Sequence, residues 1–476
     1  MHSFESDYTA GARVEILRRL NETNLEQLPG YGSDKYCESA KEKIRAACDC
    51  PGADIFFMVG GTQTNAVVID SMLPSYGGVI AAQTGHISDH EAGAIEFTGH
   101  KVIALPVYDG KLRAEDVWMY MKDYWQDASH QHFVYPGMVY ISYPTEFGTL
   151  YTKRELVELA SVCRWYNIPL YIDGARLGYG LMSPKCDITL PELAQLCDVF
   201  YIGGTKVGAL FGEAAVFTKH NMPRYFSTIA KQHGALLAKG RLLGLQFDTL
   251  FTDDLYFRIS KHAINMAMQI RDAFDARGLQ FYLHSPTNLQ FLIMENKAVR
   301  ALQQKIAFHT WGKVDEEHSV ARFATSWSTT QEDVDALIDA IKDGTAVTEM
   351  LPTAGLLVLI ALTSLAFGAA AGITCSHASC GFAKNLRRDL FYKIQTFSFA
   401  NIDEFSSSSL VTRLTTDINN VQQAFMMLIR IAVRSPLVLV FAFTMAYAMG
   451  GSVAMVYLVI IPLLGFGLFF IIFKVR

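Results

Sequence analysis

The 476-residue sequence predicts an α/β domain followed by an all-α transmembrane segment. Three observations lead to this fold class. Short apolar runs alternate with helical periodicity from about residue 35 to 240, and a long helix with a few short strands follows. No Asp, Glu, Lys or Arg occurs at 351–383 or at 435–473. Uncharged apolar runs of that length suit a bilayer, which needs about 20 apolar residues for each helical span.

Residues 1–240 are predicted to form a large domain with an N-terminal arm. Helical stretches such as 153–166 and 190–196 separate unbroken apolar strands, which is typical of a mostly parallel sheet covered on both faces. The expected strands are Asp54–Val59, Gly78–Ala82, Val102–Ala104, Val139–Ser142, Pro169–Ile172, Val199–Ile202 and Ala214–Phe217. Ligands bind beyond the carboxyl ends of such strands, so a site is expected there.

Residues 241–345 are predicted to form a smaller α+β domain. Its expected elements are a helix at Leu255–Arg277, strands at Phe281–Tyr282, Leu289–Met294 and Val320–Trp327, and a helix at Gln331–Lys342. Gly344 suits the end of the last helix, because glycine is favoured just beyond a helix C-terminus.

The two parts of the chain differ in charge. Residues 1–345 carry 32 Lys and Arg against 41 Asp and Glu, whereas residues 346–476 carry 9 against 5. An acidic soluble part without a basic run argues against nucleic-acid binding. The eight cysteines lack metal-binding spacing, and the N-terminus lacks the apolar run of a signal peptide. We therefore expect the first part to be cytoplasmic and to bind no metal.

Four polar motifs follow predicted strands. They are Gly-Gly-Thr-Gln-Thr-Asn at 60–65, His86, Asp173-Gly-Ala-Arg176 and Thr205-Lys206. Each alone has an ordinary explanation: a turn, a structural histidine, a local ion pair and a surface lysine. Together they match the needs of pyridoxal phosphate: a helix start for the phosphate, a flat neighbour for the ring, an acid for the pyridine nitrogen and an amine for the aldehyde. The glycine motif lacks the spacing of dinucleotide or nucleoside-triphosphate loops.

Residues 1–343 resemble the pyridoxal-phosphate threonine aldolase family, within the aromatic amino acid beta-eliminating lyase/threonine aldolase group. The resemblance rests on the four motifs and on Glu5-Ser-Asp7, Gly30-Tyr-Gly-Ser-Asp34, Gly85-His86 with Glu91, and Ala321-Arg322-Phe. It implies the architecture called fold type I, with a large α/β/α domain, a small α+β domain and an active site at the interface of a homodimer or homotetramer.

The resemblance implies roles for the residues that bind pyridoxal 5'-phosphate. Lys206 would hold the cofactor covalently, Asp173 would pair with the ring nitrogen, and His86 would stack on the ring. The phosphate would be held by Gly60, Gly61 and Thr62, with Arg176 also near the cofactor.

Other residues would contact the amino-acid substrate. Its carboxylate would be gathered by Ser6, Arg176 and Arg322. Tyr31 would enter the neighbouring subunit's site, where Lys231 is a weaker candidate for a phosphate contact.

The implied reaction is cleavage of threonine-like β-hydroxy amino acids, of L-threonine or L-allo-threonine type, to glycine and an aldehyde. In Tyr143-Pro-Thr-Glu146-Phe-Gly148, a glutamate stands where many low-specificity relatives have a histidine. Glu146 is therefore a catalytic candidate, while the identity of the base and the threo/erythro preference stay open. Another fold-type-I β-eliminating lyase is an alternative.

Residues 346–476 are predicted to be integral to the cell membrane, in contact with lipid through spans at about 351–373, 431–450 and 453–473. The Lys and Arg residues between 384 and 434 place the connecting segment in the cytosol by the positive-inside rule. A buried soluble helix is the alternative for 351–373, which is the least apolar of the three spans.

Residues 351–476 resemble part of the transmembrane domain of ABC exporters, most clearly at 385–423. This resemblance implies two helices that project into the cytosol and a coupling helix near Ile402–Ser406 that would touch a nucleotide-binding domain on a separate chain. The sequence contains no Gly-x4-Gly-Lys-Ser/Thr motif, so no ATP hydrolysis is expected from this chain. A membrane component of an ABC-type exporter is the alternative function.

The two resemblances conflict in topology. With residues 384–430 in the cytosol, a span at 351–373 would put the first part outside the cell. We interpret the chain as two unrelated pieces joined end to end, unless residues 351–373 do not span and the first part stays inside.

Overall fold

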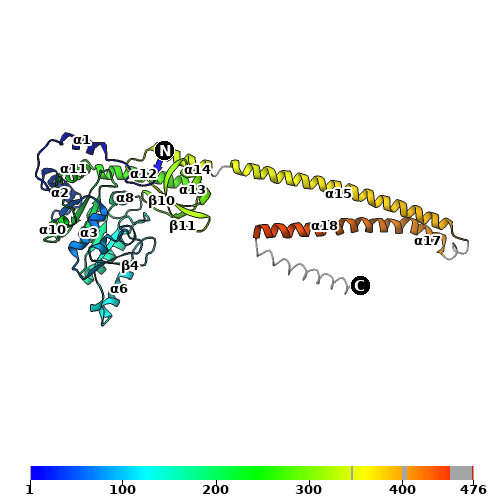
Figure 1. The fold of residues 1–476 in the computed structure, drawn as a ribbon, viewed down its shortest axis with the longest axis horizontal. Coiled ribbons are helices and arrows are strands. Elements are labelled where there is room, and N and C mark those ends of the chain that lie inside the picture. Colours follow the sequence, from blue (N-terminus) through cyan, green and yellow to red (C-terminus); the bar gives the residue numbers. More distant parts are fainter. Residues whose placement is uncertain (1, 345–346, 399–401, 403–404, 451–473, 475–476) are drawn as a thin grey trace. The chain divides into compact units, whose positions relative to one another are not determined.

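The computed structural model describes residues 2–344, 347–398, 402, 405–450 and 474. The chain divides into two compact units, Met1–Ala346 and Val347–Arg476. Figure 1 shows the fold of both units.

A seven-stranded sheet forms the centre of the first unit. Its strands are β2 (Asp54–Met58), β3 (Gly77–Ala82), β4 (Lys101–Leu105), β5 (Tyr135–Ser142), β6 (Leu170–Asp173), β7 (Val199–Gly203) and β8 (Glu213–Phe217). They lie in the order β2-β8-β7-β6-β5-β3-β4. Strand β8 runs in the opposite direction to the other six strands. All seven predicted strands are therefore present in one mostly parallel sheet.

Helices cover both faces of this sheet (Figure 1). They are α1 (Val14–Glu22), α2 (Lys35–Ala47), α3 (Gly61–Met72), α4 (His86–Asp89), α5 (Ala94–Phe97), α6 (Ala114–Gln126), α7 (Lys153–Tyr166), α8 (Leu177–Leu181), α9 (Leu190–Leu196), α10 (Phe226–Gln232) and α11 (Arg241–Leu250). Side chains of β5 alternate between two cores: Val139 and Ile141 join one, and Met138 and Tyr140 join the other. This alternation explains the unbroken apolar run, because both faces of the strand are buried.

A second, five-stranded sheet has the order β1-β11-β12-β10-β9. Its strands are β1 (His2–Phe4), β9 (Phe281–Leu283), β10 (Leu289–Glu295), β11 (Ile306–Lys313) and β12 (His318–Ala324), and the helices are α12 (Leu255–Asp275), α13 (Asn296–Gln303) and α14 (Gln331–Gly344). The sequence did not predict β1 and β11, which pair in parallel with Phe4 opposite Phe308. Both side chains are buried in the small core, so this pairing fixes the start of the chain next to the small sheet.

The second unit is helical. Its elements are α15 (Val347–Gln395), α17 (Ser407–Thr412), a π-helical turn at Arg413–Asp417 and α18 (Ile418–Gly450). The predicted span 351–373 lies within α15 and 431–450 within α18, whereas 453–473 lies outside the described residues. Of the predicted coupling helix at Ile402–Ser406, residues 403 and 404 also lie outside them. Among the described residues, one helix, Val358–Gln395, is long and apolar enough to cross a membrane.

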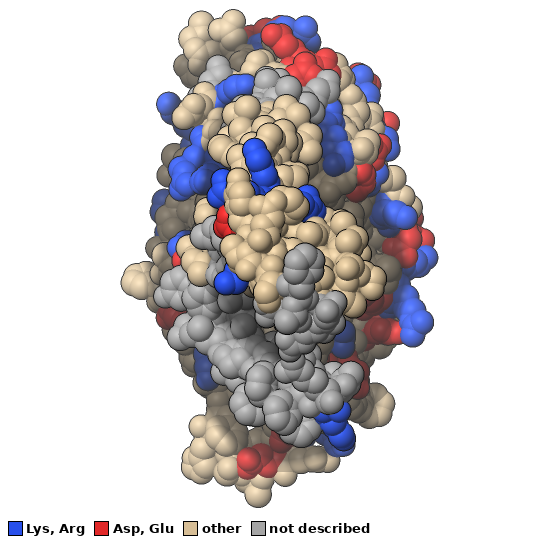
Figure 2. Space-filling model, turned by 90° about the vertical axis from the view of Figure 1, so that its right-hand side faces the viewer, with Lys and Arg blue, Asp and Glu red and all other residues tan. Residues whose placement is uncertain are grey.

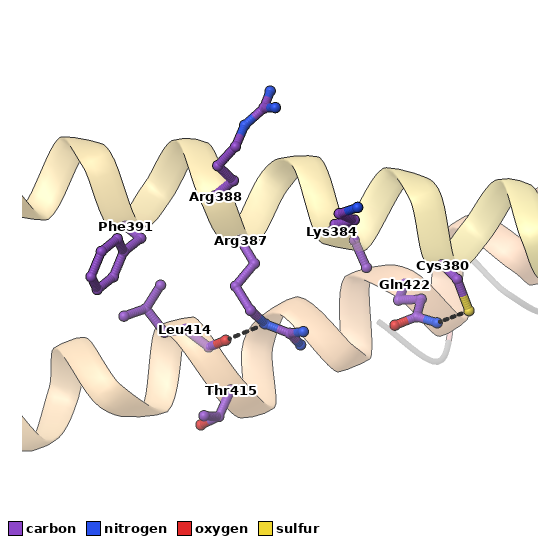
Figure 3. Close-up of a pocket in the computed structure, with 9 residues that line it drawn as sticks. Cys380, Lys384, Arg387, Arg388, Phe391, Leu414, Thr415 and Gln422 are labelled. Carbon is purple, nitrogen blue, oxygen red and sulfur yellow. Dashed lines mark hydrogen bonds between the residues drawn. The ribbon is translucent and has the colours of Figure 1, made fainter.

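Polar contacts join α15 to the segment that includes α18. Arg387 donates from Nε to the Leu414 carbonyl at 3.1 Å and from Nη2 to Asn419 Oδ1 at 3.0 Å, beside a hollow of about 600 Å³ that Lys384 and Phe391 also line (Figure 3). Figure 2 shows one face of the molecule. The described surface nearest the viewer there is mostly uncharged, and several Lys and Arg side chains lie between the uncharged residues.

Candidate active site

A cavity of about 250 Å³ lies where β2, β5, β6 and β7 end. The structure brings together there eight residues that the sequence singled out: Gly60, Gly61, Thr62, His86, Glu146, Asp173, Arg176 and Lys206. They come from separate strand ends, as expected for a parallel sheet whose ligands bind at the carboxyl edge. The four separate motifs therefore belong to one site.

The N-terminus of α3 forms one wall of the cavity. Gly60 is its N-cap residue, and no side chain caps the helix there. A Cβ atom at Gly60 would meet nothing within 4 Å, whereas one at Gly61 would lie 3.0 Å from the Tyr201 hydroxyl. The first backbone N–H groups of a helix lack partners inside the helix and favour an anion. This wall is therefore suited to a phosphate group.

Asp173 ends β6 as a buried carboxylate. Its Oδ2 accepts hydrogen bonds from the Tyr140 hydroxyl at 2.6 Å and from Asn65 Nδ2 at 3.0 Å, and its Oδ1 accepts from the Ala175 N–H at 3.0 Å. Burial acts to raise the pKa of Asp173, but the charge of His86 and these hydrogen bonds outweigh burial and lower the pKa. Asp173 therefore stays ionised and can hold a proton on a ring nitrogen.

His86 begins α4 and borders the same cavity. Its Nδ1 lies 2.7 Å from Oε1 of the buried Glu91. Burial acts to lower the pKa of His86, but the hydrogen bond to Glu91 and the charges of Asp173 and Glu91 raise it overall. The contact with Glu91 also fixes the plane of the imidazole, as a residue that lies against a flat ring requires.

Lys206 follows β7 in a short loop and keeps some solvent contact through the cavity. The backbone carbonyl of Lys206 accepts a hydrogen bond from the Tyr179 hydroxyl at 2.6 Å. Burial and then the nearby charge of Arg176 lower the pKa of the Lys206 amine, against the opposing effect of three carboxylates. A lower pKa increases the fraction of neutral amine, which is the form that reacts with an aldehyde.

The residues present fit pyridoxal phosphate. An uncapped helix start for the phosphate, an ionised acid for the pyridine nitrogen and a partly buried amine for the aldehyde all border one cavity. These three groups correspond to the three polar ends of that cofactor.

Comparison with known proteins agrees with this site. The family model described as beta-eliminating lyase matches residues 3–339. The chain belongs to the beta-eliminating lyase family. It is a pyridoxal-phosphate-dependent lyase, as the sequence predicted.

Individual relatives match about seven tenths of the chain of this lyase. The low specificity L-threonine aldolase of Pseudomonas aeruginosa is 29% identical over 71% of this chain and 96% of its own length. The solved threonine aldolase of Leishmania major is 38% identical, with a TM-score of 0.70, over 73% of this chain and all of that chain. An aspartate aminotransferase from Thermus thermophilus, 14% identical with a TM-score of 0.53, shares the fold. The predicted fold type I is thus confirmed.

The C-terminal part matches a different family. The model of the ABC transporter transmembrane region matches residues 326–475. An uncharacterised ABC transporter ATP-binding protein of Bacillus subtilis is 38% identical over 109 residues, which are 22% of this chain and 19% of that protein. The chain therefore spans about a fifth of that transporter protein.

A second cavity of about 490 Å³ adjoins the first and shares Glu146, Arg176 and Lys206 with it. Arg322 lies here, 5.0 Å from the centre of the Trp311 ring. In the described part of the lyase, Arg322 Nε and Ser6 Oγ are buried without a hydrogen-bond partner. Unpaired buried donors are costly, so this pair suits an incoming carboxylate.

Arg176 already has a carboxylate partner within the chain. Its Nε and Nη2 donate to the two carboxylate oxygens of Asp7 at 2.6 and 3.0 Å, and Asn288 Nδ2 donates to Asp7 Oδ2 at 2.9 Å. Sequence reasoning had assigned Arg176 to the substrate carboxylate. In this structure its bidentate donors are engaged by Asp7, while Arg322 and Ser6 keep free donors.

Glu146 lies between the two cavities and lines both. Its Oε1 accepts hydrogen bonds from the Ser142 hydroxyl at 2.6 Å and the His86 backbone N–H at 2.9 Å. Burial raises the pKa of Glu146, although the Ser142 hydrogen bond opposes this effect. A carboxyl with a raised pKa can exchange a proton nearer to neutral pH than an exposed one.

Tyr31 and Lys231 lie together but do not line either cavity of the lyase. The Lys231 ammonium nitrogen lies 5.1 Å from the centre of the Tyr31 ring, and 53% of Tyr31 is exposed. The expectation that both residues reach a neighbouring subunit's site stays a prediction.

Sequence reasoning gave no role to several residues of the site, although Asn65 ends one of the motifs. Asn65, Tyr140 and Tyr201 hold Asp173, and Glu213 borders Lys206. Tyr140 and Tyr201 read as members of apolar strands, with no signal that their hydroxyls meet one carboxylate. Glu213 did carry a signal, because a glutamate that opens an apolar strand is unusual among buried residues.

We predict that Asp7→Asn lowers the free energy of unfolding by about 3 kcal/mol, because it leaves the buried Arg176 charge without a counter-charge. Burial acts to raise the pKa of Asp7, but Arg176 lowers it overall. The stabilisation is therefore full above the ordinary aspartate pKa of about 3.9 and is lost as pH falls through the lowered pKa. Denaturant unfolding of the parent chain and of Asp7→Asn between about pH 7 and pH 3 measures this stabilisation.

Glu15→Gln is the matched control, since the partly exposed Glu15–Arg13 pair is worth at most about 1 kcal/mol. Equal unfolding curves for Asp7→Asn and the parent chain would show that the Arg176 pair does not stabilise the fold.

Proposed function

We propose that this lyase cleaves the Cα–Cβ bond of threonine-like β-hydroxy amino acids, giving glycine and an aldehyde. The observation that carries the proposal is the position of Glu146, which borders both the cavity of Lys206 and Asp173 and the cavity of Ser6 and Arg322. Similarity over nearly the whole length of two proteins named threonine aldolases supports the same substrate class.

In the proposed reaction, Arg322 and Ser6 bind the substrate carboxylate with their unpaired donors. This contact directs the β-hydroxyl toward Glu146, which borders the same space. The side chain of Arg176 positions Asp7 and the N-terminal arm that contains Ser6. His86 would lie against the cofactor ring, and the α3 N-terminus with Gly60, Gly61 and Thr62 would hold the phosphate.

The bound cofactor supplies a protonated ring that accepts the electron pair left on Cα. Asp173 keeps the proton on the ring nitrogen because its own pKa is lowered. The ionised Glu146 takes the β-hydroxyl proton, the hydroxyl oxygen forms a carbonyl, and the Cα–Cβ bond breaks. A proton then returns to Cα, so that glycine and the aldehyde together contain every atom of the amino acid that entered.

We predict that Lys206→Ala abolishes the visible absorption of the bound cofactor and reduces acetaldehyde release from threonine to background. The physical reason is that, among the described residues that line this cavity, Lys206 has the only primary amine that can bond to the aldehyde. Lys219→Ala is the control, because Lys219 forms an exposed ion pair with Asp198. Absorption spectra and an acetaldehyde assay on the full chain provide the measurements.

The same assay separates this proposal from its alternatives. A β-eliminating lyase would release pyruvate from serine or cysteine and no acetaldehyde from threonine. A transporter component with an accessory soluble part, which the ABC transmembrane match favours, would have neither activity. Either result would refute the proposed reaction.

We predict that Glu146→Gln reduces kcat by about 100-fold or more, the usual effect of losing a general base. Burial raises the pKa of Glu146, and only the ionised form accepts a proton. In the parent enzyme kcat/KM therefore falls as pH drops through this raised pKa, and the Gln variant lacks that acid limb.

Glu158→Gln is the control for this variant, because Glu158 forms an exposed pair with Arg154. An acid limb that persists unchanged in Glu146→Gln would assign the base to another residue of the cavity.

We propose that the second unit lies in a membrane. On α15 the apolar side chains Leu356, Val358, Leu359, Ile360, Leu362, Leu365 and Phe367 are all more than half exposed. Exposed apolar surface of this extent is unusual in water, and the run is long enough for a bilayer. The neighbouring Lys384, Arg387 and Arg388 suit the cytosolic side.

We predict that the full chain stays in the membrane pellet after an alkaline carbonate wash. Leu365→Arg with Phe367→Arg should move a large share of it to the supernatant, because each arginine near a bilayer centre costs about 3 kcal/mol. Exposed positions outside α15, such as Leu25→Arg and Phe97→Arg, provide the matched control. Equal pelleting of all variants would contradict membrane insertion of α15.

A further inference from the structure

Glu213 is a buried carboxyl that the proposed reaction does not use. It opens β8, is only 4% exposed and borders the same cavity as Lys206. Its Oε2 accepts a hydrogen bond from the Gly204 N–H at 3.0 Å, and the Thr205 side chain is also hydrogen-bonded to it. Glu213 therefore holds the two residues that lead directly into Lys206.

Three carboxyls favour the charged form of the Lys206 amine: Asp7, Asp173 and Glu213. The pKa values of Asp7 and Asp173 are lowered, so both stay ionised at neutral pH. Glu213 behaves in the opposite way, because burial raises its pKa to about 8 despite the hydrogen bond from Thr205 and the charge of Lys206. Among these three, only Glu213 can take up a proton near neutral pH.

We propose that Glu213 is a positioning residue that shares one proton with Lys206. In one arrangement the Lys206 nitrogen is an ammonium and Glu213 is a carboxylate. In the other, the proton has moved from the nitrogen to a Glu213 oxygen, and the nitrogen has a free electron pair with which to bond an aldehyde carbon. The cavity of about 250 Å³ that both side chains border is large enough for water to carry the proton between them.

Glu146 also borders this cavity with a raised pKa, but its carboxylate is held by the Ser142 hydroxyl and the His86 N–H, and the proposed reaction uses it for the β-hydroxyl proton. The other charged and titratable neighbours do not provide this exchange. Arg176 and His86 act on Lys206 as positive charges, and Asp173 acts on both partners as a fixed negative charge. Around Glu213 the other titratable groups are phenols of Tyr171, Tyr201 and Tyr256, whose pKa values burial raises. The proton is therefore exchanged within the Lys206–Glu213 pair.

The test measures how fast the cofactor-free full chain takes up pyridoxal 5'-phosphate between about pH 6 and pH 9.5, followed by the visible band of the bound cofactor. The rate reports the fraction of neutral Lys206 amine. In the parent chain we expect the rate to change with pH over a broad range. One limb of this profile, a stretch in which the rate changes with pH, should lie near the Glu213 pKa of about 8. Glu213→Gln keeps an oxygen for Gly204 but cannot change its charge.

In Glu213→Gln the limb near pH 8 should disappear. The pH at which half of the Lys206 amine is neutral should also fall, because no carboxylate remains at 213 to stabilise the ammonium. Tyr179→Phe is the control, since it removes a hydrogen bond to the Lys206 carbonyl without changing the carboxyls of the cavity. Its profile should keep the limb. A Glu213→Gln profile that superimposes on that of the parent chain would overturn the proposal.

If Glu213→Gln does not fold, Thr205→Val tests the same point. The Thr205 hydrogen bond lowers the pKa of Glu213, so its loss should move the limb to higher pH, and an unmoved limb would overturn the proposal. The inference rests on the proposed role of Lys206, and Lys206→Ala tests that role separately. A visible band in Lys206→Ala would refute the lysine assignment itself, whereas an unchanged Glu213→Gln profile refutes only the shared proton.

Discussion

The buried ion pair between Arg176 and Asp7 is the contact on which the rest of the active site depends. Arg176 follows the strand that carries Asp173, Asp7 lies in the N-terminal arm, and Asn288, which also donates to Asp7, precedes β10 of the small sheet. One carboxylate thus joins three segments that are far apart in the sequence. Because removing one partner from a buried pair is much more costly than losing an exposed one, the geometry of both cavities depends on this contact.

The site also shows how one functional group takes different roles in different surroundings. Asp173 receives hydrogen bonds from two phenols and an amide and stays ionised. Glu213 is as buried as Asp173 and Glu146 is partly buried, but fewer hydrogen-bond donors oppose burial at these two residues, so their pKa values rise. The charge of His86 and the hydrogen-bond donors around Asp173 together outweigh its burial and keep it ionised, whereas Glu146 and Glu213 can exchange protons.

Much of the large sheet could be predicted because each strand is an unbroken apolar run with helices on both sides. The strands β1 and β11 could not, because His2–Phe4 spans only three residues and the exposed positions of β11 interrupt its apolar pattern. The positions of Lys206, Asp173 and His86 followed from motifs at strand ends. The partners Asn65, Tyr140 and Glu213 depend on tertiary contacts, and the pairing of Arg176 with Asp7 joins residues 169 positions apart, which local patterns do not encode.

The attachment of the N-terminal strand has a mechanical consequence. Phe4 is fixed in the small sheet by pairing with Phe308, and Asp7 is fixed to the large sheet through Arg176. Only Glu5 and Ser6 separate these two anchors, and Ser6 faces the space in which a carboxylate would bind. A rotation of the small sheet away from the large one would stretch this two-residue strap. Any change in the spacing of the two sheets would therefore also displace Ser6 from the space in which a carboxylate would bind.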